Sequence, residues 1–186
     1  MWRQPDCLSR SDGEKMTKIT DDDLMQHFNL LRTDPQKYLS LADEVVRSNP
    51  DDPHAYFSRY QAWNRLGRKD LALADLNKTL SLEHHWITYE SRGNLLCELG
   101  RYRAALDDFN RAEAMDPEEW AGGFGPLYRA DCHACLGDET AALADCARLP
   151  DDHWTPGLFG APAGNKDRVI AEIRRRAAAA RSSRQP

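Results

Sequence analysis

A pattern of about 35 residues recurs three times in this 186-residue chain and constrains its fold more than any other feature. The copies are marked by Gly67, Gly100 and Gly137, which lie 33 and 37 residues apart. A leucine precedes each glycine, an arginine lies eight residues before it, and an Ala-Leu-x-Asp block begins five residues after it. A period of this length, with two helical segments per copy, is typical of a helical solenoid whose neighbouring repeats share one continuous core.

The segment from Trp86 to Pro117 shows the pattern most clearly and predicts two helices. Apolar residues at three- and four-residue spacing lead up to Gly100, which can adopt the left-handed conformation that closes a helix. A second helical pattern begins within three residues and ends at Asp116-Pro117, because proline cannot continue the hydrogen-bond ladder. Since the turn is so short, the two helices must lie antiparallel.

This segment resembles a tetratricopeptide repeat in the residue types at its key positions. The matching residues are Tyr89, Gly93, Leu96, Gly100, Tyr102, Ala105, Phe109, Ala112 and Pro117. The resemblance implies an all-α fold, a right-handed helical solenoid of antiparallel helix pairs, with a concave groove lined by the first helix of each pair. We expect a bacterial member of this family.

The quality of the match divides the chain into segments. We predict a single helical domain over residues 19–181, between a disordered leader (1–18) and a frayed tail (182–186). The leader is polar and aperiodic, and either Met1 or Met16 is the natural start. The predicted domain comprises a degenerate repeat over 19–52, repeats over 53–85, 86–117 and 124–149, a loop over 150–164 and a capping helix over 165–181.

Charge is distributed unevenly along the chain. The net charge is −5, yet residues 166–186 carry five more basic than acidic residues, so the remaining body is strongly acidic. An acidic body favours basic or apolar partners, and we expect no nucleic acid partner. No stretch approaches the roughly 20 apolar residues that span a bilayer, so no membrane partner is expected either.

The cysteines and the search for catalytic motifs both favour a protein that catalyses no reaction. Five cysteines without paired spacing argue against a disulfide framework, and the N-terminus opens no apolar run of a signal peptide, so we expect a cytoplasmic location. No nucleophile triad, phosphate-binding glycine loop or paired-acid motif stands out, and no cofactor is expected. The alternative is a thiol- or metal-dependent enzyme in the region of Cys132 and Cys135, with His133 and Cys146. Packing is the favoured role, because Cys132 and His133 occupy packing positions of the repeat.

One arginine and one aspartate recur in each repeat on facing helices. The predicted pairs are Arg59 with Asp75, Arg92 with Asp108, and Arg129 with Asp145. We expect each arginine to bind its aspartate across the helix pair or to reach the next repeat, which fixes the register of the stack. The alternative is a ladder of free arginines that binds an extended ligand.

The concave positions of the family supply the predicted partner-binding residues. Among the residues at these positions Arg65 is the only strong base, so we expect a peptide or helix with apolar anchors and some positive charge. Ordinary solvated surface is the alternative. The predicted residues are Phe57, Gln61, Asn64, Arg65, Glu90, Asn94, Leu127 and Asp131, joined by Trp154 and Phe159 of the following loop.

The predicted function is that of a non-catalytic adaptor that binds a partner protein in this groove. An alternative within the binding class is a chaperone for secreted, type III translocator-like proteins, which some tetratricopeptide proteins with flanking helices escort. The partner, its pathway and the choice between groove and loop stay open. The oligomeric state is open too, although exposed side chains at Trp120, Trp154 and Phe159 would allow a weak dimer.

Overall fold

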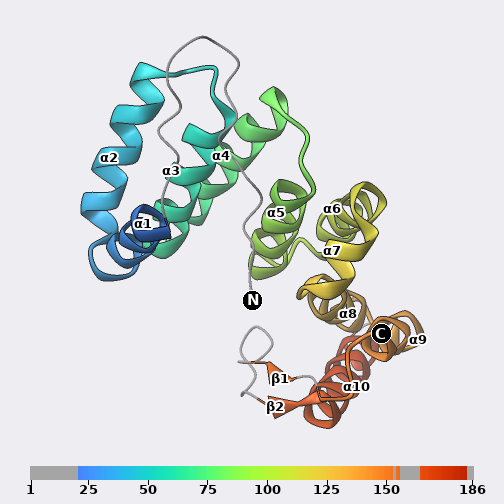
Figure 1. Ribbon diagram of the computed structural model, residues 1–186. Helices are drawn as coiled ribbons and strands as arrows, with labels where there is room; N and C mark the ends of the chain where they lie inside the picture. Colours follow the sequence, from blue (N-terminus) through green and yellow to red (C-terminus); the bar gives the residue numbers. More distant parts are fainter. Residues whose placement is uncertain (1–20, 153, 156–163, 184–186) are drawn as a thin grey trace. The chain divides into compact units, whose positions relative to one another are not determined.

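The computed structural model of the protein describes residues 21–152, 154–155 and 164–183. This part of the chain is almost wholly helical (Figure 1). It groups into two compact units, Met1–Glu83 (unit 1) and His84–Pro186 (unit 2). The predicted leader, residues 1–18, and Phe159 of the predicted loop lie outside the described residues.

Unit 1 is made of two antiparallel helix pairs. Proline occupies the first turn of α2 (Pro35–Ser48) and of α3 (Pro53–Arg65), where a helix needs no N–H donor. The preceding aspartates cap these helices, since Asp34 accepts a hydrogen bond from the backbone N–H of Lys37 at 2.9 Å and Asp52 accepts one from His54 at 3.0 Å. The helices are α1 (Asp21–Thr33), α2 (Pro35–Ser48), α3 (Pro53–Arg65) and α4 (Lys69–Leu82). The core shared by α1, α2 and α3 contains Tyr38, Leu39, Ala42 and Ala62, with Leu30, Leu31, Trp63 and Leu66 packed against it.

Unit 2 contains two further helix pairs, a short helix between them and a terminal helix. A two-residue antiparallel pairing of β1 with β2 precedes the terminal helix and is a small departure from the wholly helical expectation. The helices are α5 (Trp86–Glu98), α6 (Tyr102–Met115), α7 (Pro117–Gly122), α8 (Gly125–Cys135), α9 (Glu139–Ala147) and α10 (Lys166–Ser182), and the strands are β1 (Trp154–Thr155) and β2 (Gly164–Asn165).

The three marker glycines close α3, α5 and α8, the first helices of the last three pairs, as their position in the repeat predicts. Gly67, Gly100 and Gly137 have φ values of 73°, 70° and 78°, and no other described residue has a positive φ. These values lie in the left-handed region, which a side chain with a Cβ atom rarely adopts. The chain reverses at each glycine, and the second helix begins within two residues.

Gly93 shows why the repeat needs a small residue in its first helix. A Cβ atom built at Gly93 would lie 2.7 Å from Cε1 of Phe109, which is fully buried on α6. The absence of a side chain therefore lets α5 and α6 approach closely, with the Phe109 ring filling the space between them.

The predicted arginine–aspartate pairs form in both units. Each guanidinium donates two hydrogen bonds to the carboxylate of its partner at 2.6 to 2.9 Å, for Arg59 with Asp75, Arg92 with Asp108 and Arg129 with Asp145. Two of the arginines also reach the preceding helix pair, since Arg59 contacts Asp43 at 3.1 Å and Arg129 contacts Glu113. The structural interpretation of these arginines is confirmed, because they join helices of the fold.

The junction between the second and third repeats folds as the short helix α7 and buries Trp120 completely. A Cβ atom at Gly125 would lie 2.3 Å from the Trp120 ring, so the indole packs directly on the backbone at the start of α8. The Arg129 guanidinium lies 4.5 Å from the ring centroid. Trp120 is therefore a packing residue, and its predicted role in a dimer is wrong.

The terminal helix α10 covers the last helix pair. Its Val169, Ile173 and Ala177 are buried in one cluster with side chains of α8 and α9. The fold class predicted from the sequence, all-α and built of antiparallel helix pairs of tetratricopeptide type, is confirmed. Within the described ranges, no helix is both long and apolar enough to cross a membrane.

Candidate functional site

The predicted binding residues of α3 form a partly exposed face in unit 1. The Phe57 ring lies 5.3 Å from that of Tyr60, and Gln61 accepts a hydrogen bond from the Tyr38 hydroxyl at 3.3 Å. Asn64 accepts a hydrogen bond from the Lys69 ammonium at 2.7 Å. Arg65, at the end of the helix, is exposed. This face thus offers one aromatic ring and one cation to a ligand, while two of its amides already bind neighbouring side chains.

The predicted binding residues of α5 lie on one face of that helix in unit 2, because Glu90 and Asn94 are four residues apart. The side-chain oxygen of Asn94 is buried and has no hydrogen-bond partner among the described residues. Desolvation by burial raises the pKa of Glu90 to about 7. Tyr128 of the neighbouring helix α8 lies near Glu90 and Glu98. Burial raises the pKa of its phenol, and the charges of these two acids raise it further. The α5 face therefore presents hydrogen-bond acceptors in a poorly solvated place.

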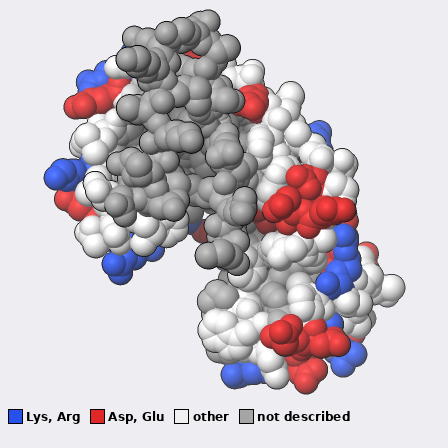
Figure 2. Space-filling view, viewed as in Figure 1, with Lys and Arg blue, Asp and Glu red and all other residues white. Residues whose placement is uncertain are grey.

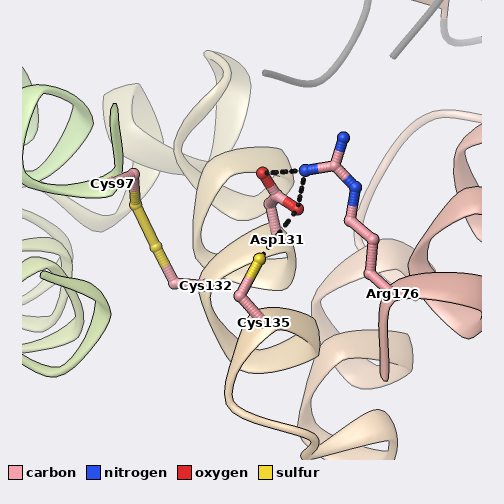
Figure 3. Close-up of a disulfide and its surroundings, with 5 residues drawn as sticks. All are labelled: Cys97, Asp131, Cys132, Cys135 and Arg176. Carbon is pink, nitrogen blue, oxygen red and sulfur yellow. Dashed lines mark hydrogen bonds and ion pairs between the residues drawn. A yellow bond between two sulfur atoms is a disulfide. The ribbon is translucent and has the colours of Figure 1, made fainter. Parts of the chain in front are cut away.

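The predicted binding residues of α8 are covered by α10, which corrects the sequence interpretation. Leu127 is fully buried in the cluster that contains Val169 and Ile173. Asp131 is 2% exposed, and both of its carboxylate oxygens accept hydrogen bonds from Arg176 of α10, at 2.8 and 3.0 Å (Figure 3). Burial raises the pKa of Asp131, an effect that the Arg176 charge opposes. Neither residue is available to a partner while α10 is in place.

The arginines of α10 are engaged by acidic residues of unit 2. Arg175 and Arg176 both bind Glu172, and the hydrogen bond from Arg175 is the main reason that the pKa of Glu172 falls to about 2. Arg181 binds Glu139 at 2.8 Å, and Arg174 lies 3.9 Å from the same carboxylate. On the face drawn in Figure 2, acidic patches over unit 2 have basic side chains beside them. The excess of positive charge near the C-terminus is thus divided among ion pairs.

Two of the cysteines form a disulfide, contrary to the expectation from their spacing. Cys97 of α5 is bonded to Cys132 of α8, across 35 residues of sequence (Figure 3). The spacing carried no sign of this bond, because the two residues sit at different positions of successive repeats. The disulfide joins the first helices of two helix pairs in unit 2.

The two free cysteines in the described part of the chain, Cys135 and Cys146, do not support the alternative of a thiol- or metal-dependent enzyme. Cys132 is consumed by the disulfide, and burial raises the pKa of Cys146 to about 11. Burial also raises the pKa of Cys135, whose thiol donates to Asp131 at 3.8 Å. A thiol acts as nucleophile or metal ligand in its thiolate form, which these environments disfavour. Among the described residues, no group of three or more His, Cys, Asp or Glu side chains is placed to hold a metal ion.

Two other surface features of unit 2 lie outside the predicted groove positions. Trp154 of β1 is 64% exposed, as expected for a residue of the predicted loop. A surface pocket of about 340 Å³ lies beside α6 and the end of α8. The sequence analysis did not identify this pocket, whose lining residues occupy ordinary positions of the repeat. They are Arg103, Leu106, His133, Leu136 and Asp138.

Antiparallel helix pairs closed by a left-handed glycine, with a small residue at the helix crossing and a repeated arginine–aspartate pair, define a tetratricopeptide-type helical repeat protein. This fold is a protein-interaction fold.

Comparisons with known proteins agree with this class. No family model matches the chain. Two crystal structures of MamA superimpose with TM-scores of 0.63 and 0.62, at 16% and 13% identity, over 86% and 88% of this chain and 82% and 96% of the other. At such low identity the likeness shows the fold alone.

Curated relatives match shorter parts of longer proteins. The chain is 32% identical over 82 residues to DnaJ homolog subfamily C member 3 of mouse and of human, and 29% identical over 136 residues to the human Protein SGT1 homolog. These matches cover 44% and 72% of this chain but only 16% and 34% of the relatives. All of these proteins contain tetratricopeptide-type repeats.

Proposed function

We propose that the chain is a non-catalytic adaptor that holds a peptide or helix of a partner protein on the predicted binding face of α3 in unit 1 or on that of α5 in unit 2. We place this activity in the cytoplasm, as the sequence predicts. The proposal rests on the fold class and on one contrast between equivalent helices. The face of α8 is covered by α10, whereas Phe57, Gln61, Glu90 and Asn94 on α3 and α5 are only partly buried.

The physical argument is preorganisation. A partner that binds a rigid helix face meets side chains that already have their positions, so little conformational entropy is lost on the adaptor's side. The arginine–aspartate pairs and the turn glycines hold α3 and α5 in their helix pairs without using the predicted binding residues. Substitutions on these faces should therefore alter binding while the fold persists.

The test is affinity capture from an extract of the source cell with four forms of the full chain. One variant carries Phe57→Ala and Gln61→Ala, and a second carries Glu90→Gln and Asn94→Ala. The matched control carries Asp70→Ala and Asp107→Ala, which remove exposed acids from the second helices α4 and α6. Circular dichroism first establishes that all forms have equal helix content.

A partner held by the native chain and the control, and lost from either face variant, supports the proposal. Equal recovery of that partner by all four forms would refute the assignment of the site to these helix faces. It would instead favour Trp154 as the binding residue. The same comparison tests the narrower prediction of a secretion chaperone, which requires that the captured partner be an exported protein.

A further inference from the structure

Two side chains at equivalent positions of α5 and α8, Asn94 and Asp131, differ in their hydrogen bonding. Asn94 and Asp131 are 37 residues apart, the same spacing as Gly100 and Gly137, so they occupy the same place in successive repeats. On α8 the acceptor binds the guanidinium of Arg176, which reaches it from the neighbouring helix α10. On α5 the acceptor Asn94 has a buried oxygen to which no side chain or backbone group in the described part of the chain donates a hydrogen bond.

On the face of α5 that carries Asn94, the charged side chains are carboxylates, which add acceptors beside the Asn94 oxygen. Glu90 lies one turn before it and Glu98 one turn after it on the same helix. No hydrogen bond or ion pair joins Glu90 to any of the described residues, and this carboxyl is poorly solvated. A buried acceptor without a donor costs free energy that a bound N–H group would recover.

A long basic side chain is the kind of donor that can reach a buried acceptor on the α5 face. Because the Asn94 oxygen is shut off from solvent, a donor has to enter the face rather than lie over it. Arginine and lysine carry their donors at the end of an apolar stem of three or four methylene groups. Ile87, at the preceding turn of the same face and partly exposed, provides an apolar contact for such a stem.

We infer that the α5 face binds an arginine or lysine side chain of the partner polypeptide, inserted between Glu90 and Asn94 as Arg176 is inserted against Asp131. This inference rests on the proposed adaptor function and adds the chemistry of the partner. The occupant is a basic protein segment. A phosphate backbone would place further acceptors against acceptors and is repelled.

The inference is tested by selecting binders from a phage-displayed library of random 16-residue peptides with the full chain. Enrichment of Arg and Lys in the selected peptides is expected. Selection on Glu90→Arg should remove this enrichment, whereas selection on Glu118→Arg, which changes an exposed acid of α7, should preserve it.

The strongest selected peptide then enters a double-mutant cycle read by fluorescence anisotropy. Replacing its basic residue by citrulline or glutamine, or the protein's Glu90 by Gln, should weaken binding by about 10- to 100-fold. Combining both changes should add little, because both remove the same contact. Glu118→Gln should bind like the native chain.

The outcomes separate the inference from the proposed function. Peptides that bind, lose affinity on Phe57→Ala or Asn94→Ala, and contain no excess of Arg or Lys would refute the cation site while leaving the adaptor function standing. Unchanged affinity of the basic peptide for Glu90→Gln would refute it as well. A library that yields no binder to the native chain would count against both.

Discussion

The Arg92–Asp108 pair allows a quantitative test of what holds the helix pairs in register. Asp108 is almost fully buried, with its side chain 3% exposed, and it receives two hydrogen bonds from Arg92 at 2.7 and 2.8 Å. Hydrogen bonding to Asp108 raises the pKa of Arg92. The guanidinium keeps its charge even without this carboxylate, because arginine is not deprotonated in proteins near neutral pH. Asp108→Ala should thus leave a partly buried cation without its carboxylate.

The expected loss in the free energy of unfolding follows from the burial of Asp108 and Arg92. Removing one partner of a buried ion pair costs about 3 to 5 kcal/mol. Because the Arg92 side chain is 19% exposed and retains some contact with water, we expect the lower end, about 3 kcal/mol. Replacing both partners by apolar residues, Arg92→Met with Asp108→Leu, should restore the stability to within about 1 kcal/mol of the native chain.

The assay is urea unfolding followed by far-ultraviolet circular dichroism. With a slope of about 2 kcal/mol per molar urea, the single substitution should lower the midpoint by about 1.5 M. Asp107→Ala, an exposed neighbour on the same helix, is the control and should change stability by less than about 0.5 kcal/mol. A loss below about 1 kcal/mol for Asp108→Ala would refute the reasoning, as would a double variant no more stable than the single one.

Four further predictions test other parts of the structure. Gly93→Ala should destabilise by about 1 to 2 kcal/mol in thermal melts, because its methyl group would displace the Phe109 ring, and an unchanged midpoint would contradict the close approach of α5 and α6. Leu127→Ala should cost about 2 to 5 kcal/mol in urea unfolding, as expected for a core residue and not for a groove residue. Cys97→Ser, or reduction of the native chain, should cost about 4 kcal/mol through the lost 35-residue crosslink, and equal unfolding of oxidised and reduced protein would argue against it. For Glu90, whose folded pKa of about 7 lies above its unfolded value, stability is lost as pH rises from about 5 to 8, so Glu90→Gln should flatten this part of the stability profile in urea titrations at each pH.

The repeat pattern alone was enough to predict the helix pairs. A left-handed glycine, a small residue at the crossing and a proline at a helix start each impose a local conformation that neighbouring sequence determines. The arginine–aspartate pairs were equally predictable, since residues 16 apart in a pair of antiparallel helices face each other in every copy, as Arg92 and Asp108 do. These features recur because the two helices of each copy pack against each other through the same contacts.

The binding residues were less predictable from the sequence. The family's concave positions predict which way a side chain points, but not whether another helix covers it. Glu90 and Asn94 stay on a partly exposed face, but Leu127 and Asp131 at matching positions are covered by α10. The apolar stripe of α10 could be recognised in the sequence. The sequence did not predict that this stripe packs against α8.

The sequence by itself therefore determined the helix pairs, their turns and their internal ion pairs, all of which depend on residues within one repeat length. Only the tertiary structure decided the burial of Trp120, the bond between Cys97 and Cys132 and the loss of Asp131 from the accessible surface. The physical reason is that each of these depends on contacts between different helix pairs, or with the terminal helix. Periodicity within one repeat carries no information about such contacts.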